Sequence, residues 1–461
     1  MVNEAWYGER DNRSLRYAGR VLPSDRPILL RLGAESAAHY DGQVAALVAA
    51  NLLARMTRMV MLDIPDVDVV APLPWAGAKL RDRLREVAFA ADPQGLFEMR
   101  LERDGDYVLS LGRTGGAATA HGSGWNAFVG QGVSPVPDCD QLNPVGPALA
   151  AIVAVARLFA LQMEPMDGPH FLNAFTWQTG APPDGVPPRF DSMPDLGSIW
   201  AVGLGSVGTA ALYFLTLATQ RLSVSLFDMK TVEVHNLDRS PVFSASDAEE
   251  RRPKVDATEL YLRSVGVRTA AKEPVALDQS RVWFAREAGT PDVVISAANE
   301  RNVRYTIEQS APPLQVYGTT GRNWQASVIR HIPLLEACSC CLFPPERPQA
   351  ATVCAEAAVD QQTTGERVDA SLPFLSFLAG LMAAAEVLKA ALPGYPFSPN
   401  RTTLYTHAAV QPRFVSSQIR RRPECTCAGR SSSVHRAMIG GSKYAGLSDA
   451  APRRLAGAAA S

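Results

Sequence analysis

The stretch from Gly197 to Lys254 constrains the fold of this chain more than any other. It opens with a short apolar run that leads into the turn Gly203-Leu204-Gly205-Ser206-Val207-Gly208. An apolar segment without turn residues follows over 209–220, and a second apolar run over 222–227 ends at Asp228. This order predicts a strand, a glycine turn, a helix and a second strand with an acid at its tip. We therefore expect a nucleotide-binding βαβ unit, whose glycines let the backbone approach phosphate.

The glycine turn alone does not choose the nucleotide, because G-x-G-x-x-G fits NAD, FAD, SAM or ATP. Asp228 can accept hydrogen bonds from the ribose of any of them. The chain continues with Asn236, Arg239 and Lys254. A protein that binds a dinucleotide does not need these three residues. An enzyme that acts on the phosphates of ATP uses such donors to stabilise the charge that develops on them. The alternative for Arg239 and Lys254 is a pair of surface cations, and their spacing from Asp228 favours the phosphate role.

Composition limits the function further. With 461 residues the chain has room for two or three domains, and its net charge of −1 argues against a nucleic-acid binder that works by charge. The first twenty residues are polar and lack the apolar core of a secretory signal. Two apolar runs, 148–163 and 373–392, contain charged residues, whereas a membrane span needs about 20 uninterrupted apolar residues. We expect buried core helices in a cytoplasmic protein with no membrane partner.

The first half has the element pattern of a nucleotide fold without its glycine motif. The turn at 33–41 lacks G-x-G-x-x-G, so we expect no phosphate loop there. The glycine-rich segment 112–132 is either a docking loop or a long turn. A turn signal at Asp104-Gly105 separates two strand candidates. The expected elements are strands at 26–32, 58–64, 97–101 and 107–111, and helices at 42–56, 76–87 and 147–163.

Prolines and glycines between 177 and 197 mark the clearest linker. Beyond it, short buried strands alternate with helices, which predicts a doubly wound, mostly parallel sheet. We place one domain at 1–185 and a second at 186–427. Residues 428–461 are rich in Ala, Gly and Ser, and we expect a flexible tail there.

The run Phe227-Asp228-Met229-Lys230-Thr231-Val232-Glu233-Val234-His235-Asn236-Leu237-Asp238-Arg239-Ser240 resembles the ThiF/MoeB/ubiquitin-activating-enzyme family, whose pattern is D…V…-N-L-N-R-Q…F. An acidic stretch and Lys254 follow, as in that family. The resemblance implies two ThiF-like adenylation halves and an ATP site. In that site Asp228 holds the ribose, and Arg239 and Lys254 act on the phosphates together with Asn236. The glycines that shape the loop are then Gly203, Gly205 and Gly208.

One position departs from the family. The pattern D-x-V-x-x-A-x-D-N usually supplies an aspartate for Mg²⁺, and Asn299 stands at that position here. An amide oxygen can bind Mg²⁺ but adds no charge, so binding should be weaker. Glu300 is the candidate substitute, and an impaired site is the alternative.

The cysteines also resemble those of the family. Cys338-Ser339-Cys340-Cys341-Leu342-Phe343-Pro344 is similar to its C-x-x-C-L-F-P, and Cys425-Thr426-Cys427 stands where a second pair follows. The resemblance implies a structural Zn²⁺ site, because two thiolate pairs form a tetrahedron. Metal-free thiols are the alternative. The implied ligands are Cys338, Cys341, Cys425 and Cys427.

Two more segments resemble the family. Cys354 lies in a stretch similar to its C-x-E-A-G-V loop, where a cysteine can take the activated acyl group as a thioester. A structural role for Cys354 is the alternative. Near the N-terminus, Leu15-Arg16-Tyr17-Ala18-Gly19-Arg20 is similar to R-Y-x-R-Q, which implies that Arg16 or Arg20 reaches the phosphates of the second half.

The family's motifs occur in the second half alone. This arrangement resembles the pseudo-dimeric plan of ubiquitin-activating enzymes, in which one adenylation half is inactive and the other is active. In this plan 1–185 is an inactive adenylation domain, and further dimerisation stays open. The compact bacterial enzymes of Bil-type antiphage operons are similar in plan. The resemblance implies that the chain adenylates the C-terminal glycine of a ubiquitin-like protein, forms a thioester and passes it to a conjugating enzyme. The alternatives are a sulfur-carrier adenylyltransferase, an NAD(P)-dependent oxidoreductase and a non-catalytic scaffold.

Overall fold

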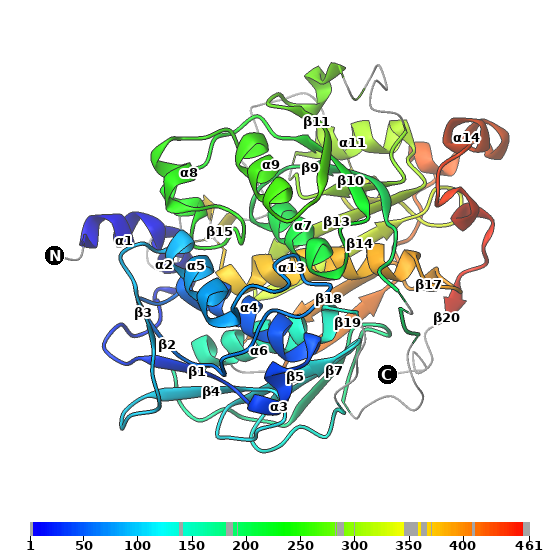
Figure 1. Cartoon of the computed structure of the whole chain (residues 1–461). Coiled ribbons are helices and arrows are strands. Elements are labelled where there is room, and N and C mark those ends of the chain that lie inside the picture. Colours follow the sequence, from blue (N-terminus) through cyan, green and yellow to red (C-terminus); the bar gives the residue numbers. More distant parts are fainter. Residues whose placement is uncertain are drawn as a thin grey trace.

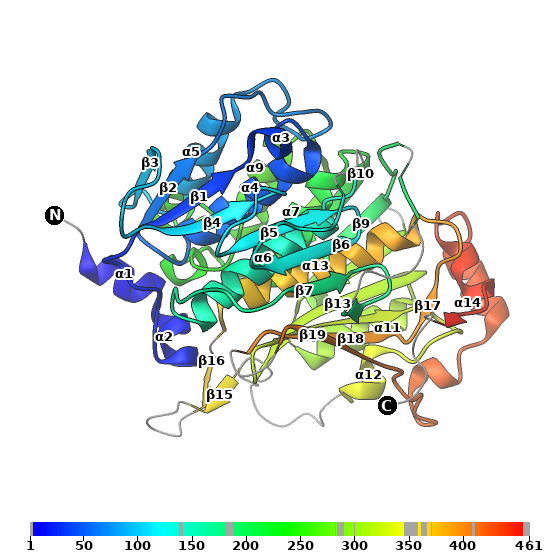
Figure 2. The same ribbon diagram turned by 90° about the horizontal axis from the view of Figure 1, so that it is seen from below.

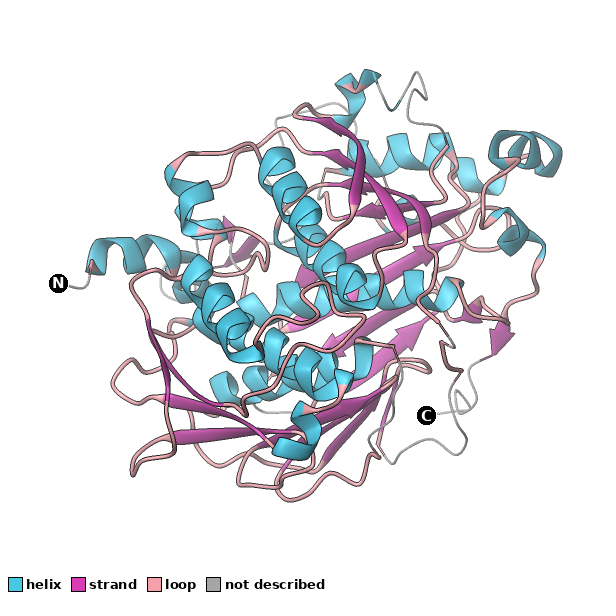
Figure 3. Cartoon of the chain, viewed as in Figure 1, coloured by secondary structure: helices cyan, strands magenta, loops and turns pink. Residues whose placement is uncertain are grey.

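Most strands of the described part of the chain belong to two eight-stranded sheets, and four short ones form two small sheets, β15-β16 and β17-β20 (Figures 1 and 3). The computed structural model describes residues 3–137, 142–180, 188–190, 192–281, 283, 290–298, 300–344, 358–360, 367–369, 371–407 and 411–454. The strands of the first sheet are β1 (Ile28–Leu32), β2 (Met59–Asp63), β3 (Leu96–Met99), β4 (Tyr107–Leu111), β5 (Thr119–Ser123), β6 (Asn126–Gly130), β7 (His170–Asn173) and β8 (Gln178–Thr179). Those of the second are β9 (Gly197–Val202), β10 (Leu222–Phe227), β11 (Arg268–Glu273), β12 (Val293–Ser296), β13 (Leu314–Gly321), β14 (Gln325–His331), β18 (Arg401–Tyr405) and β19 (Arg413–Ser417).

The two sheets have the same topology. The first runs β3-β2-β1-β4-β5-β6-β7-β8 and the second runs β11-β10-β9-β12-β13-β14-β18-β19. In each sheet the first five strands are parallel and the last three are antiparallel. The expectation of two similar α/β halves with mostly parallel sheets is therefore confirmed.

The helices surround these sheets and fill the space between them. Those of the first half are α1 (Glu4–Arg10), α2 (Asn12–Ala18), α3 (Ala34–Ala37), α4 (Tyr40–Ala54), α5 (Leu80–Ala91) and α6 (Val145–Ala160). Those of the second are α7 (Ser206–Ala218), η1 (Val234–Asn236), α8 (Ala245–Glu249), α9 (Lys254–Ser264), η2 (Leu277–Gln279), α11 (Arg301–Ser310), α12 (Ser339–Leu342) and α13 (Pro373–Ala390). The C-terminal helices are η3 (Thr426–Ala428), α14 (Ser432–Ile439) and η4 (Ala445–Asp449), and the remaining short strands are β15 (Ala358–Asp360), β16 (Arg367–Asp369), β17 (Phe397–Ser398) and β20 (Arg453–Arg454).

The core lies where the two halves meet. Helices α4 and α6 pack together in the first half, α7 and α13 pack together in the second, and α13 also packs on α6 (Figures 1 and 2). All residues of α4, α6 and α13 are buried, which explains why their sequences are apolar on every side. Among the described residues, α13 is the one helix long and apolar enough to cross a membrane, and its burial identifies it as a core helix.

The antiparallel ends of the sheets also touch. The backbone N–H of Phe414 in β19 donates to Thr179 Oγ1 in β8 at 2.9 Å. The rings of Trp177 and Phe414 pack edge to face, with centroids 5.1 Å apart. This contact covers two strand edges that would otherwise expose unpaired backbone groups.

The first half has α3 where the second half has its glycine loop. Strand β1 ends at Leu32, and α3 separates it from α4, so the N-terminus of α4 does not follow the strand directly. The space is filled, because a Cβ on Gly33 would lie 2.1 Å from Thr114 Cγ2 and one on Gly42 would lie 2.0 Å from the Ser36 carbonyl oxygen.

The turn expected at Asp104-Gly105 is present, but the strands on either side of it do not pair with each other. Strand β3 pairs in parallel with β2, and β4 pairs in parallel with β1. A flexible tail was expected over 428–461, and the described residues of this segment, up to 454, form α14, η4 and β20. Ser442 and the backbone of Lys443 donate to Asp292, which fixes this segment to the second sheet.

Candidate active site

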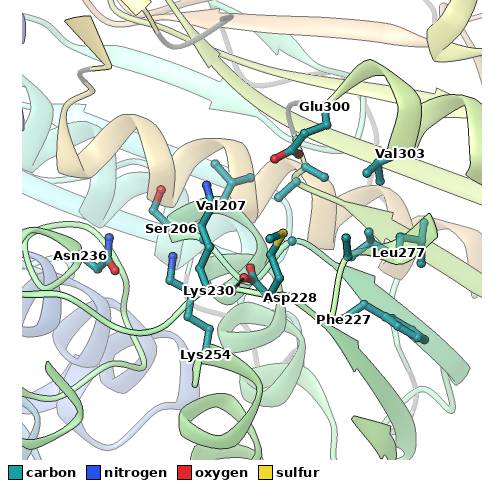
Figure 4. Close-up of a pocket in the computed structure, with 18 of the residues that line it drawn as sticks. Ser206, Val207, Phe227, Asp228, Lys230, Asn236, Lys254, Leu277, Glu300 and Val303 are labelled. Carbon is teal, nitrogen blue, oxygen red and sulfur yellow. Dashed lines mark hydrogen bonds between the residues drawn. The ribbon is translucent and has the colours of Figure 1, made fainter. Parts of the chain in front are cut away.

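A cavity of about 590 Å³ opens at the carboxyl ends of β9, β10 and β12 (Figure 4). Ligands of open α/β sheets bind at this edge. Most of its lining comes from the second half, and Arg13 of α2 comes from the first. The predicted residues in its wall are Gly203, Gly205, Asp228, Asn236, Arg239 and Lys254.

The three glycines of the loop have different roles. Gly203 has a positive φ of +84°, and a Cβ there would lie 2.8 Å from the Ala298 backbone nitrogen. Gly208 is packed on the loop itself, since its Cβ would lie 2.0 Å from the Gly203 carbonyl oxygen. Among the described residues, a Cβ on Gly205 would meet no heavy atom within 4 Å. Gly205 precedes α7 and lines the cavity, so its missing side chain leaves room for a ligand.

Asp228 stands at the tip of β10 and ties the loop to the strand. Its two carboxylate oxygens accept hydrogen bonds from the backbone N–H of Leu204 at 2.7 Å and of Lys230 at 2.8 Å. The aromatic rings of Trp200 and Trp283 pack on Phe227, the residue before it. The carboxylate is therefore held in place at the cavity wall, as a ribose-binding acid must be.

The cavity is polar at one end and apolar at the other. Figure 4 shows Lys230, Lys254 and Asn236 on one side, Phe227 and Leu277 on the opposite side, and Asp228 between them. This order matches a nucleotide laid across the cavity, with phosphates, ribose and base in succession.

Lys254 and Asn236 line the polar end of the cavity. Lys254 begins α9 and is buried, and this burial lowers the pKa of its ammonium group while Asp228 opposes the shift. The Oδ1 atom of Asn236 accepts a hydrogen bond from the backbone N–H of Glu233 at 3.1 Å. The side-chain amide of Asn236 therefore has its NH₂ group as donor toward a ligand.

Arg239 is buried and forms a bidentate ion pair with its neighbour Asp238. Its Nε and Nη2 atoms donate to the two Asp238 oxygens at 2.6 and 2.7 Å. Ser14 of α2 donates to the same carboxylate at 3.3 Å. The first half thus contacts the acid that orients the guanidinium group.

Arg13, like Lys230, is a cation of the cavity wall that the sequence motifs did not predict. It lines the cavity and its Nη2 lies 2.9 Å from Nε2 of His235, while Nδ1 of His235 lies 3.2 Å from Glu233. Burial, together with the charges of Arg13, Arg239 and Lys254, lowers the pKa of His235 to about 3. A neutral imidazole explains the geometry, because Nδ1–H donates to Glu233 and Nε2 accepts from Arg13.

The two arginines expected at the phosphates lie elsewhere. Arg16 is exposed on α2, and Arg20 donates to the Ala160 carbonyl oxygen at 3.1 Å. An arginine of the basic N-terminal segment does line the cavity, as expected, but the orientation of α2 determines that it is Arg13. Tyr17 fixes that orientation, because its hydroxyl donates to the Gly321 carbonyl oxygen and accepts from the Trp324 N–H.

Asn299 and Cys354 lie outside the described residues. Glu300, the proposed substitute for a metal-binding aspartate, lines the cavity and is exposed. Arg304, in the first turn of α11, is buried with its guanidinium carbon 4.8 Å from the Phe343 ring centroid.

The four expected cysteines come together in the second half. The Sγ atoms of Cys338 and Cys425 are 3.4 Å apart, as are those of Cys341 and Cys427, and all four lie within 4.8 Å of one another. Tetrahedral zinc with bonds of about 2.3 Å separates its sulfur ligands by about 3.8 Å. Burial raises the pKa of the Cys425 thiol to about 11. The cluster fits a structural Zn²⁺ ion, and the metal would favour the thiolates.

Two family models match the sequence of this chain. The ThiF family model matches residues 196–427, half of the chain, and the BilD N-terminal domain model matches residues 27–168. No curated protein matches the sequence. Among solved structures, E. coli MccB with ATP is 15% identical, covering 52% of this chain and 68% of its own, with a TM-score of 0.39. The microcin C7 biosynthetic enzyme MccB with N-formylated MccA is 17% identical, covering 50% and 67%, with a TM-score of 0.38.

The ThiF match begins just before β9 and ends at the last cysteine of the cluster. It includes the glycine loop, Asp228 and the phosphate-end residues of the cavity. Members of this adenylyltransferase family use ATP to activate carboxylates. The chain belongs to the ThiF family.

Proposed function

We propose that this protein activates a ubiquitin-like protein by adenylating its C-terminal carboxylate. The observation that carries the proposal is the single cavity in which a glycine loop, Asp228, Asn236, Arg239 and Lys254 converge. The match of residues 27–168 to the BilD N-terminal domain supports the plan of a compact bacterial activating enzyme, in which 1–185 is the inactive adenylation domain and 186–427 the active one. Such an enzyme acts in antiphage defence in the cytoplasm.

The reaction starts when a carboxylate oxygen of the partner's terminal glycine attacks the α-phosphorus of ATP. A bond forms between this oxygen and phosphorus, and the bond to the β-phosphate bridging oxygen breaks, releasing pyrophosphate. Charge develops on the phosphate oxygens, where Lys254, Arg239 and Arg13 are held in a mostly buried site. Fixed cations in such a site stabilise the transition state more than solvated ones.

Mg²⁺ would balance the phosphate charge, and Glu300 with Asn299 are the residues that would hold it. In the second step a thiolate, assigned to Cys354, attacks the acyl carbon, AMP leaves, and the thioester passes to a conjugating enzyme. The Zn²⁺ ion would link α12 to η3 without taking part in the chemistry.

Pyrophosphate exchange tests the first step. The purified chain is incubated with ATP, Mg²⁺, labelled pyrophosphate and a ubiquitin-like protein that ends in glycine. Label should enter ATP only when the partner is present, and a partner without its last glycine is the matched control. Exchange that persists with the shortened partner, or its absence with every ubiquitin-like protein tried, would refute the proposal.

The second step has its own readout. A partner–enzyme adduct that resists SDS but is cleaved by thiol reagents should form in the wild type and disappear in Cys354→Ala, while exchange continues. An adduct that persists in Cys354→Ala would refute the assignment of this cysteine. A persulfide or thiocarboxylate on the partner would indicate sulfur transfer, and NAD(P) binding in place of ATP would indicate an oxidoreductase.

A further inference from the structure

The last turn of α4, in the first half, contacts the loop that carries Arg239 in the second. Arg55 caps this helix and is buried, with Nη1 donating to the Leu237 carbonyl oxygen at 2.5 Å and Nη2 donating to that of Phe243 at 3.1 Å. These two carbonyls lie on either side of Arg239 in the sequence. One guanidinium group therefore joins both ends of the loop.

Asn51 lies one helical turn before Arg55 and completes the contact. Its Nδ2 donates to the Pro241 carbonyl oxygen at 3.0 Å, and its Oδ1 accepts from Arg55 Nε at 2.8 Å. Three backbone carbonyls of residues 237–243 are thus bound by two side chains of the first half. The loop itself has no regular secondary structure beyond η1, so these bonds determine much of its path.

The charges around Arg55 link it to the same acid that holds Arg239. Burial lowers the pKa of Arg55 to about 9, and the carboxylate of Asp238 opposes this shift while Arg10 adds to it. Asp238 is the acid that holds Arg239 in its bidentate pair. Burying a guanidinium group is costly unless its donors are satisfied, and Arg55 directs its donors to the loop.

We propose that Arg55 and Asn51 are positioning residues that set the phosphate-binding loop of the second half, with Arg239 as the group through which they act. The inactive half then serves as a scaffold for the ATP site. This inference rests on the proposed function, since it assumes that Arg239 binds the phosphates of ATP. A displacement of about 1 Å in such a group costs on the order of 100-fold in rate.

Tyr40 offers a matched control on the same helix. Its buried hydroxyl donates to the Leu217 carbonyl oxygen at 2.8 Å, which also joins the two halves. Leu217 lies in the last turn of α7, away from the glycine loop that begins this helix. Loss of the Tyr40 bond weakens the same interface without touching the phosphate loop.

The experiment measures the dissociation constant of ATP by calorimetry for the wild type, R55K, N51A and Y40F in the full chain. R55K keeps the charge, but its single nitrogen cannot reproduce the two separate donors that Arg55 directs at the carbonyls of Leu237 and Phe243. A weakened hydrogen bond from Arg239 to phosphate should lower ATP affinity by roughly 10- to 100-fold, and N51A should lower it by a smaller factor. Y40F should bind like the wild type. Melting temperatures of all variants show that each is folded at the measuring temperature.

A double-mutant comparison separates positioning from a structural effect. If Arg55 acts through Arg239, R55K should have little further effect in an R239A background, while an unrelated weakening of the fold would add in full. Full additivity, or equal loss in R55K and Y40F, would overturn the inference. A wild-type chain that binds no ATP would instead overturn the proposed function, so the two failures are distinguishable.

Discussion

Replacement of Gly205 by alanine separates ligand binding from folding. Among the described residues, the new methyl group would meet no heavy atom within 4 Å, and the backbone at Gly205 is extended, with φ −74° and ψ −166°. The change removes a favourable helix cap but also reduces the freedom of the unfolded chain, so unfolding free energy should shift by no more than about 1 kcal/mol. The methyl group would point into the cavity where phosphate must approach the helix N-terminus.

The cost to ATP binding can be worked out from the lost contacts. A hydrogen bond to a charged group contributes roughly 1.5–3 kcal/mol, so displacing the phosphate from one backbone donor should weaken binding roughly 10- to 100-fold. Calorimetry with ATP and chemical denaturation of the same preparation provide the two numbers. Gly446→Ala is the control. Gly446 lies in η4, outside the cavity lining, and a Cβ there also meets no described heavy atom within 4 Å.

Gly208→Ala should behave in the opposite way. Its Cβ would overlap the Gly203 carbonyl oxygen, so folding itself should weaken by about 1–3 kcal/mol or more. A folded Gly205→Ala chain that binds ATP as tightly as the wild type would refute the role assigned to Gly205.

Three further results are expected. Arg13→Ala should weaken ATP binding about tenfold, whereas Arg16→Ala, on the exposed side of the same helix, should not; equal effects would contradict the assignment. Because the pKa of His235 is lowered from 6.5 to about 3, the folded chain binds fewer protons below pH 6.5, and stability present above that pH is lost on acidification. At pH 5 this loss of stability is about 2 kcal/mol. The unfolding free energy of His235→Gln, measured by chemical denaturation, should therefore fall less between pH 7 and pH 5 than that of the wild type. Metal analysis should find one zinc per chain, and Cys425→Ser should lower both zinc content and melting temperature; a zinc-free chain that is stable in chelator would refute the site.

Local patterns were sufficient to predict the βαβ unit. Glycine spacing and two apolar runs predicted β9, α7 and β10, because each depends on residues close in sequence. The resemblance to the family's cysteine motifs implied which four cysteines come together, and their Sγ atoms do lie within 4.8 Å of one another. The identical strand order of the two halves agrees with the expected internal duplication.

Long-range contacts explain what the sequence did not predict. Arg13 is three residues from Arg16, and only the packing of Tyr17 against Gly321 and Trp324 determines which of them faces the cavity. The turn between β3 and β4 was predictable because its signal is local, whereas the partners of the two strands, β2 and β1, depend on long-range pairing. The C-terminal segment has a composition typical of disorder, yet Asp292 binds it through Ser442 and Lys443.

The central claim is that the chain has one ATP site, formed by the second half with Arg13 from the first. Titration of the full-length chain with ATP by calorimetry tests it most directly. We predict one ATP per chain in the wild type and no measurable binding in a folded Arg239→Ala, Lys254→Ala double variant. Two ATP per chain, or one that still binds to the double variant, would contradict the claim.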